Sequence, residues 1–176
     1  MTYNPDIHHR RSVRLKEYDY RSAGAYFVTI CTFQRECLFG DVVDGEMRLN
    51  NFGEIVLEEW LRSEVVRNNV SLDGFVTMPN HFHSILLLND SCRGEALPRP
   101  VVAGSIGAIL GQFKSIVTKR INALRDNPGC PVWQRNYYEH VIRNEDDLAN
   151  IRQYIANNPL KWDMDENNPV NAVTIP

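Results

Sequence analysis

The 176-residue chain contains no apolar run close to the ~20 residues that a membrane-spanning helix needs. Its basic, polar N-terminus lacks the apolar core of a signal peptide. It also lacks a C-x-x-C pair, because its four cysteines (Cys31, Cys37, Cys92 and Cys130) are widely separated. That spacing argues against a zinc knuckle or a disulfide scaffold. We therefore expect a cytoplasmic protein with reduced thiols and no membrane partner.

No excess of basic residues marks the chain as a nucleic-acid-binding protein. Its formal net charge is −3 at pH 7, which by itself argues against such a partner. The charge is unevenly distributed, however: basic residues crowd the N-terminus, and no acidic residue occurs between Ala96 and Arg125. A basic face and ordinary solvated charges are both compatible with this pattern.

Hydrophobic patterning predicts a mixed fold in one domain, the size that 176 residues suit. The predicted strands are residues 26–33, a hairpin over 37–50, residues 71–78, 82–88 and 132–142. The predicted helices are residues 51–67, 104–124 and 144–158, and residues 90–100 form a predicted loop. This order predicts an α+β, ferredoxin-like (βαββαβ) fold, with an antiparallel sheet, helices on one face and a further C-terminal helix. Many unrelated functions use that fold, so it predicts none by itself.

A pair of histidines lies in the segment 78–88 (MPNHFHSILLL). His81 and His83 are two residues apart, so a strand presents both imidazoles on one side. Neutral imidazole is a common metal ligand, and two ligands leave positions open for water or a phosphate oxygen. Alternate histidines also occur as ordinary hydrogen-bonded residues of sheets, so the pair alone does not decide.

A second constellation lies on the last predicted helix. Tyr154 and Asn158 are four residues apart and share one helix face. The phenol can attack phosphorus, and the amide oxygen can bind a metal; the same tyrosine can equally complete the apolar side of the helix. Pro159 disfavours helical geometry at Asn158, which would displace that side chain.

Aromatic and basic residues interleave between Trp133 and Arg143. Such a segment suits stacking on unpaired bases and neutralising phosphates. It also offers Tyr137 and Tyr138 as rival nucleophiles. A strand with one buried aromatic face explains the pattern equally well.

The order and spacing of these motifs resemble those of the HUH single-strand transposases, specifically the REP-associated tyrosine transposases. The resemblance extends from about Arg10 to Trp162. The stretches that carry it are 10–16 before 18–20, 24–29 (GAYFVT), 78–83 (MPNHFH), 133–134 (WQ), 138–143 (YEHVIR), 154–155 (YI) and 158–161 (NPLK). It implies a basic leader at residues 1–24, a catalytic domain at 25–162 and a tail at 163–176.

The resemblance implies that His81, His83 and Asn158 bind Mg²⁺ or Mn²⁺ and that Tyr154 is the nucleophile. It implies cleavage and rejoining of single-stranded DNA near REP-like hairpins through a 5′-phosphotyrosine, by a monomer or homodimer. A free phenol has a pKa near ~10, so the cation, or else Arg152 or Lys161, must favour the phenolate. No Walker-type glycine loop occurs in the sequence, so no nucleotide cofactor is expected.

The candidate DNA contacts are basic residues of the leader and the long helix, together with the aromatic and basic segment. They are Arg10, Arg11, Arg14, Lys16, Lys114, Lys119, Arg120, Trp133, Arg135 and Arg143. Two alternatives to the transposase remain open at this stage. One is a catalytically silent hairpin-binding module of the same fold, and the other is a metal hydrolase that uses His81, His83 and His140.

Overall fold

The computed structural model of the chain describes residues 22–89 and 105–171. The predicted leader contacts Arg10, Arg11, Arg14 and Lys16, and the predicted loop at 90–100, lie outside the described residues. The helices are α2 (Asn51–Val65), α3 (Ile106–Leu124) and α4 (Glu145–Asn157), with short 3-10 turns η1 (Phe33–Arg35), η2 (Pro159–Met164) and η3 (Pro169–Asn171). The strands are β1 (Gly24–Cys31), β2 (Gly40–Val43), β3 (Glu46–Leu49), β4 (Val70–Thr77), β5 (His81–Leu88) and β6 (Tyr138–Ile142).

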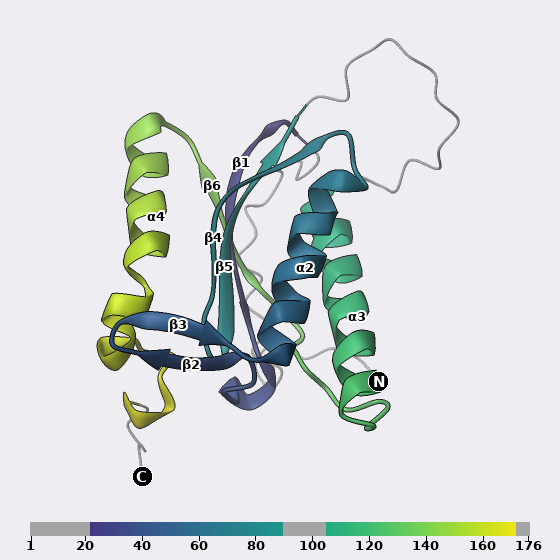
Figure 1. Cartoon of the computed structure of the whole chain (residues 1–176). Helices are drawn as coiled ribbons and strands as arrows, with labels where there is room; N and C mark the ends of the chain where they lie inside the picture. The colour runs from purple at the N-terminus through teal and green to yellow at the C-terminus, as the bar shows by residue number, and fades with distance from the viewer. Residues whose placement is uncertain (1–21, 90–104, 172–176) are drawn as a thin grey trace, which may run out of the picture.

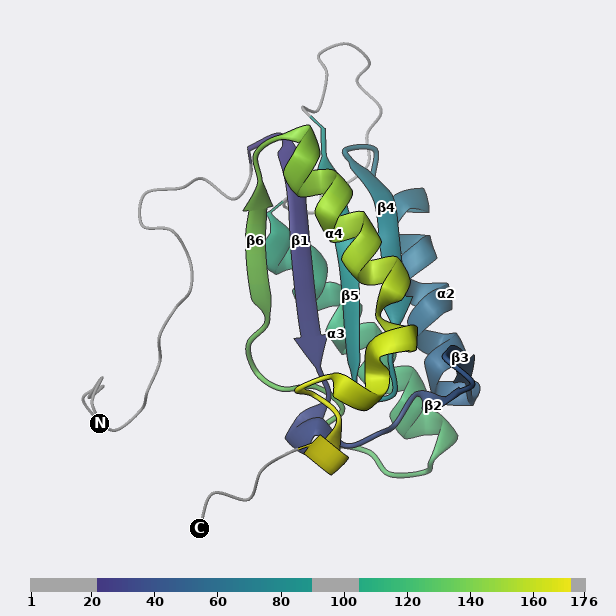
Figure 2. The same ribbon diagram turned by 90° about the vertical axis from the view of Figure 1, so that its left-hand side faces the viewer.

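Four strands form one antiparallel sheet in the order β4-β5-β1-β6, which Figure 2 shows face-on behind α4. This order, with α2 following β1 and α3 following β5, confirms the predicted ferredoxin-like fold. The remaining strands, β2 and β3, pair as a separate hairpin, which lies across one end of the sheet (Figure 1). Among the described residues, no helix combines the length and the hydropathy needed to cross a bilayer.

The two helices α2 and α3 cover one face of the sheet (Figure 1). The fully buried Trp60 of α2 meets Phe82 of β5 and Phe113 of α3, with ring centroids 5.0 and 5.1 Å away. Edge-to-face aromatic contacts of this kind contribute roughly 0.5–1.5 kcal/mol beyond the area they bury. The main core of the protein therefore lies between these helices and the sheet.

The opposite face of the sheet is covered by α4 (Figures 1 and 2). A smaller apolar cluster joins it there, formed by Phe27, Ile85, Ile142 and Ile155. Successive side chains of a strand point to opposite faces. Because Phe82 packs into the main core, His81 and His83 point toward the α4 side.

The segment before β6 departs from the predicted strand at residues 132–142, since only Tyr138–Ile142 joins the sheet. Trp133 forms an isolated bridge with Thr32. The next three carbonyls, of residues 134–136, turn toward the ammonium group of Lys114. Their hydrogen bonds go to a side chain and not to a neighbouring strand, which explains the shorter β6.

Two glycines on α2 and α3 form a matched pair for testing helix packing. A Cβ on Gly53 would lie 2.3 Å from the carbonyl oxygen of Phe39, whereas a Cβ on Gly111 would meet nothing within 4 Å. We expect Gly53→Ala to destabilise the protein and Gly111→Ala to stabilise it by up to about 1 kcal/mol through helix propensity. Urea unfolding measures both, and equal effects of the two substitutions would contradict this packing.

Candidate nucleophile and metal site

The two histidines lie at the start of β5, one of the two central strands. They are buried, with 0% and 2% of their surfaces exposed, and their ring centroids are 4.5 Å apart. His83 pairs with Thr29 across the β1–β5 register. Its Nδ1 lies 2.8 Å from the Thr29 hydroxyl oxygen, while Nδ1 of His81 lies 2.9 Å from Oδ1 of Asn80. Each imidazole thus has one nitrogen held by the protein and Nε2 left facing the α4 side.

Burial keeps both imidazoles neutral at pH 7. It lowers the pKa of His81 to about 4, although the negative charge of Asp165 acts in the opposite direction. Burial, followed by the proximity of His81, lowers the pKa of His83 well below its usual value. A neutral imidazole keeps a lone pair on one nitrogen, as metal binding requires.

Tyr154 reaches the histidines from α4. Its hydroxyl oxygen lies 3.4 Å from Nε2 of His83, and the two rings are 5.2 Å apart. The tyrosine packs edge-on against Phe27 and keeps 45% of its surface exposed. The hydroxyl is therefore beside the histidine pair and on a side that a substrate can approach.

Asn158 closes the group on the side of His81. Its Oδ1 lies 3.3 Å from Nε2 of His81, and the residue is buried. Asn158 keeps helical angles (φ −61°, ψ −44°) in spite of the following Pro159. The 3-10 turn η2 follows α4 directly and has Pro159 in its first turn. A proline is tolerated in the first turn of a helix, so Pro159 does not displace Asn158.

The donor set is one that could hold a divalent cation. Two neutral imidazole nitrogens and one amide oxygen converge, and no cluster of three or more His, Cys, Asp or Glu suited to a metal occurs in residues 22–89 and 105–171. A cation held here would keep several positions for water or phosphate oxygens, as Mg²⁺ prefers. The third histidine of the hydrolase alternative, His140, instead pairs with Asp147 at 2.9 Å and does not join the group.

The local charges disfavour a phenolate. Burial, and then the negative charge of Asp165, raise the pKa of Tyr154. Arg152, one of the two predicted basic helpers, is committed to Asp73 through contacts of 2.6 and 2.9 Å. The other, Lys161, is exposed. Arg152 is therefore not free to favour the phenolate.

The rival tyrosines occupy different places. Tyr137 packs against the main core, on the α3 side of the sheet. Tyr138 is exposed on the α4 side and contacts Phe27 at a ring distance of 6.3 Å. The hydroxyl of Tyr154, in contrast, lies 3.4 Å from Nε2 of His83.

Three of the predicted DNA contacts are used inside the molecule. Lys114 donates to the carbonyls of residues 134–136, and burial lowers its pKa to about 8. Arg120 forms ion pairs of 2.7 Å with both Glu58 and Glu59. Trp133 is 7% exposed and packs on Phe39 and Phe113, so its ring is not a free stacking platform.

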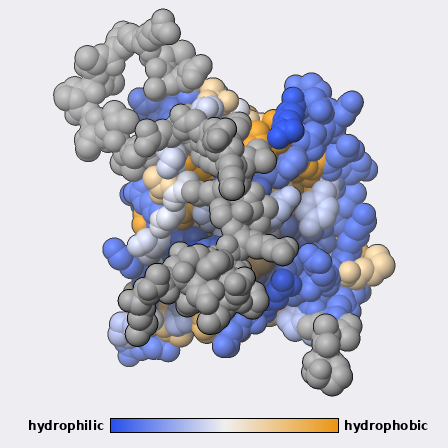
Figure 3. All heavy atoms as spheres, turned by 180° about the vertical axis from the view of Figure 1, so that it is seen from behind, coloured by the Kyte–Doolittle hydropathy of each residue, from blue (hydrophilic) through white to orange (hydrophobic). Residues whose placement is uncertain are grey.

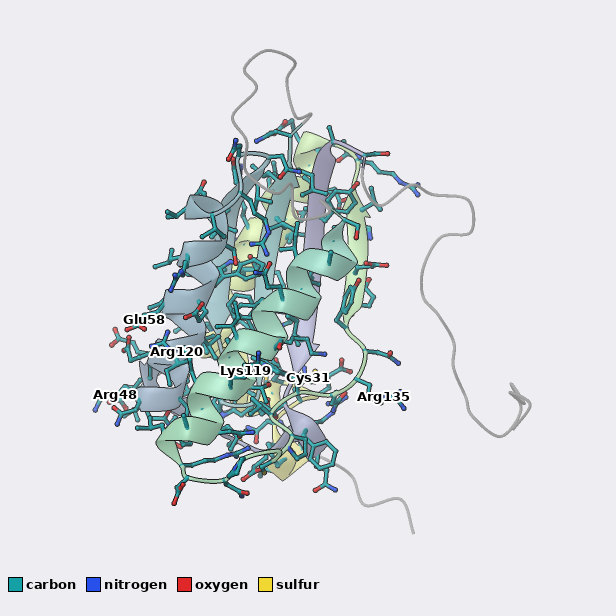
Figure 4. All side chains as sticks on the ribbon, turned by 90° about the vertical axis from the view of Figure 1, so that its right-hand side faces the viewer. Cys31, Arg48, Glu58, Lys119, Arg120 and Arg135 are labelled. Carbon is teal, nitrogen blue, oxygen red and sulfur yellow. The ribbon has the colours of Figure 1, made fainter. Side chains whose placement is uncertain are left out.

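Three others remain exposed, two of them beside a groove. Lys119 and Arg135 are solvent-exposed and line an open groove of about 930 Å³ between α3 and residues 128–137. Figure 4 shows Lys119 on α3 and Arg135 on the neighbouring segment, with Arg120 turned away beside Glu58. The groove lies across the sheet from Tyr154. Arg143 is exposed before the first turn of α4, about 15 Å of helix from Tyr154.

The surface around α4 combines polar and apolar exposed side chains, Leu160 and Met164 among the apolar ones. Viewed from behind, the side of the molecule that carries α4 is mainly hydrophilic (Figure 3). The first turn of α4 contains three acidic residues, Glu145, Asp146 and Asp147.

Sequence reasoning missed several residues that support this group. Asn80 directly precedes His81, and this adjacency in the sequence could have identified it as a supporting residue. Thr29 lies far away in sequence and is recognised only through the register of β1 and β5. Asp165 and Asn167 lie beyond the predicted domain, and no motif marks them.

Known proteins resemble the chain in both sequence and fold. No protein-family model matches it. An uncharacterized protein of Haemophilus influenzae is 42% identical over 174 residues, covering 93% of this chain and 96% of its own length. Another protein of that organism, provisionally named a REP-associated tyrosine transposase, is 30% identical over 88 residues; the match covers 48% of this chain and 46% of that relative.

A solved structure has the same fold. It is that of a REP-associated tyrosine transposase bound to a REP hairpin, with a TM-score of 0.60 and 19% identity, covering 85% of this chain and 74% of the other. The fold and the second relative confirm the resemblance to the REP-associated tyrosine transposases. The chain belongs to the same family as the uncharacterized H. influenzae protein.

The lowered pKa values of the histidines predict an acid-sensitive fold. Unfolded histidine binds protons below pH ~6.5, whereas folded His81 does so only near pH 4. The folded state therefore binds fewer protons in this interval, and the free energy of unfolding should fall as the pH drops from about 6.5 to about 4.

Urea unfolding in EDTA at a series of pH values measures this dependence. The variant His81→Gln/His83→Gln should show a flatter dependence across the same interval. An identical pH profile for the variant and the natural protein would contradict the assignment of the acid sensitivity to these two side chains.

Proposed function

We propose that this protein is a metal-dependent tyrosine transposase that cleaves and rejoins single-stranded DNA next to hairpins. One observation carries the proposal: the hydroxyl of Tyr154 lies 3.4 Å from His83, 71 residues away in sequence, within the same group as His81 and Asn158. A purely structural tyrosine has no need of two neutral histidines and an amide oxygen beside its exposed hydroxyl. The hairpin partner is supported by the structural neighbour, which is bound to a REP hairpin.

The proposed reaction is an in-line exchange at phosphorus. The Tyr154 oxygen attacks the scissile phosphate, the bond from phosphorus to the 3′-oxygen breaks, and a 5′-phosphotyrosine forms. The phenolic proton is lost and the departing oxygen gains one, so a free 3′-hydroxyl results. Attack on the phosphotyrosine by a second 3′-hydroxyl reverses the exchange and joins two strands without a nucleotide cofactor.

In this proposal His81, His83 and Asn158 would hold Mg²⁺ or Mn²⁺. The bound cation would supply Lewis-acid stabilisation of the phosphate and a positive charge near the phenol. Before substrate binds, neutral His83 can accept the hydrogen bond of the Tyr154 hydroxyl, which orients that group. The edge-on contact with Phe27 restricts the ring further.

The geometry also supports action by a single chain. Tyr154 reaches the histidines of its own chain, so the proposed site needs no residue from a second copy. A homodimer remains compatible with the proposal, although the chemistry does not depend on it. The competing proposal is a hairpin-binding module of the same fold that no longer cuts.

Replacing Tyr154 by phenylalanine tests the nucleophile. We expect Tyr154→Phe to bind a REP-like hairpin with unpaired flanks as well as the natural protein does, because only one hydroxyl is lost. It should form no covalent protein–DNA adduct on a denaturing gel in the presence of Mg²⁺ or Mn²⁺.

Tyr138→Phe is the matched control, since it removes an exposed hydroxyl on the same face of the sheet and should leave adduct formation intact. An adduct that persists in Tyr154→Phe would assign the nucleophile elsewhere. An adduct that persists in excess EDTA would exclude the metal, and no adduct with the natural protein under any condition would favour the silent binding module.

The groove beside α3 predicts a separate effect on hairpin binding. Lys119 and Arg135 are exposed there and have no acidic partner in the groove apart from Asp126. Lys119→Ala/Arg135→Ala should weaken hairpin binding and lower the slope of log K against log salt by about 2. Fluorescence anisotropy at several salt concentrations measures both quantities.

Arg48→Ala/Arg62→Ala removes the same charge from exposed positions on β3 and α2 and serves as the control. If the two double variants change the slope equally, net charge alone governs binding and the groove has no specific part in it.

A further inference from the structure

Both ring nitrogens of His81 face the oxygen of an amide side chain. Nδ1 lies 2.9 Å from Oδ1 of Asn80, and Nε2 lies 3.3 Å from Oδ1 of Asn158. A neutral imidazole carries only one N–H. One of the two nitrogens must therefore point its lone pair at an amide oxygen, which also carries lone pairs.

The contacts of Asn80 decide which nitrogen carries the hydrogen. Its Nδ2 donates to the backbone carbonyls of Arg35 (2.9 Å) and Asn167 (2.7 Å), so its Oδ1 must be the atom that faces His81. Asn80 is fully buried and has no room to exchange these partners for water. Nδ1 of His81 is therefore the donor, and Nε2 carries the lone pair.

That lone pair faces the oxygen of Asn158 on the side of Tyr154. Two acceptors 3.3 Å apart repel each other unless a cation lies between them, or unless Asn158 turns its NH₂ group toward the ring. Either change would satisfy the lone pair of Nε2, and only the cation would leave the oxygen of Asn158 facing it. His83 differs, because its Nδ1 partner is the Thr29 hydroxyl, which can either donate or accept.

Asn80 is itself held by the chain that follows η2. Oδ1 of Asn167 accepts from the Arg35 guanidinium at 2.7 Å. The backbone and side-chain nitrogens of Asn167 both donate to Asp165, at 2.7 and 2.9 Å. Asn168 donates to the carbonyl of Trp162 at 3.0 Å. These bonds fix the segment 165–168, which contacts Asn80 through the backbone carbonyl of Asn167 and is called the polar clamp below.

We propose that Asn80 is a positioning residue that fixes His81 as the Nδ1–H tautomer, and that the clamp at residues 165–168 keeps Asn80 in place. The inference rests on the proposed function, because it assigns the lone pair of Nε2 to the divalent cation. Partners that orient a metal-binding histidine in this way typically contribute 10–100-fold to metal affinity. The segment predicted as a tail thus becomes part of the site.

Nitrogen-15 NMR of the histidine rings in the metal-free natural protein at pH 7 tests the first step. Long-range proton–nitrogen correlations distinguish a ring protonated on Nδ1 from one protonated on Nε2. We expect His81 to be protonated on Nδ1. A His81 protonated on Nε2 would overturn the proposal, whatever any variant does.

Substitutions test the second step, with Mn²⁺ affinity measured by electron paramagnetic resonance. Asn80→Ala should give mixed tautomers at His81 and about 10–100-fold weaker Mn²⁺ binding. Asn80→Asp keeps an acceptor for Nδ1–H but loses both donations from Nδ2 to the carbonyls of Arg35 and Asn167, so it should keep the tautomer while weakening Mn²⁺ binding. Asn122→Ala, which removes a buried amide of α3 that bonds Cys130, is the matched control and should change neither readout.

Asn167→Ala tests the clamp and should shift both readouts in the same direction as Asn80→Ala, by a smaller amount. Unchanged tautomer and affinity in that variant would overturn the role of residues 165–168. An equal loss of the Nδ1–H tautomer in Asn80→Asp and Asn80→Ala would show that the acceptor oxygen of Asn80 does not set the tautomer. If the natural protein binds no Mn²⁺, the metal in the proposed function is wrong, while the tautomer measurement still decides the role of Asn80 independently of DNA cleavage.

Discussion

The alternation of side chains along β5 is the constraint on which the site depends. Phe82 packs against Trp60 and Phe113 in the main core, and this contact forces the neighbouring histidines to the opposite face. The strand is bordered by β4 and β1 on its two edges, so its backbone groups are committed on both sides. The hydrophobic contact of Phe82 on one face of the sheet therefore sets the positions of His81 and His83 on the other face.

Burial determines the ionisation of His81, His83 and Tyr154. Desolvation removes the charge from both histidines and raises the pKa of the phenol. All three groups are neutral at pH 7, so the site presents lone pairs and a hydroxyl in a region of low polarity. Such an environment strengthens the interaction with any cation that enters and makes an unpaired charge costly.

Much of this arrangement was predictable from the sequence, and the failures have physical causes. Strand alternation predicts the paired histidines, and helix geometry predicts that Tyr154 and Asn158 share a face. The caution about Asn158 before Pro159 was unnecessary, because a 3-10 turn continues the helix there. Trp133 and Lys114 carry the expected chemistry, yet tertiary packing uses both internally, which no local pattern reveals. Asn167 could not be predicted, since its role arises from a contact 87 residues away in sequence.

The central place of β5 also limits how the chain can vary in length. A strand with a period of two reverses all its faces when one residue is lost. A single deletion within His81–Leu88 would turn imidazoles into the apolar layer beneath α2 and α3, and a phenyl ring toward α4. The hairpin of β2 and β3 stands outside the main sheet, yet a Cβ on Gly45 in its turn would lie 2.7 Å from Cδ2 of Leu160, so residues inserted there would press against the chain that follows Asn158.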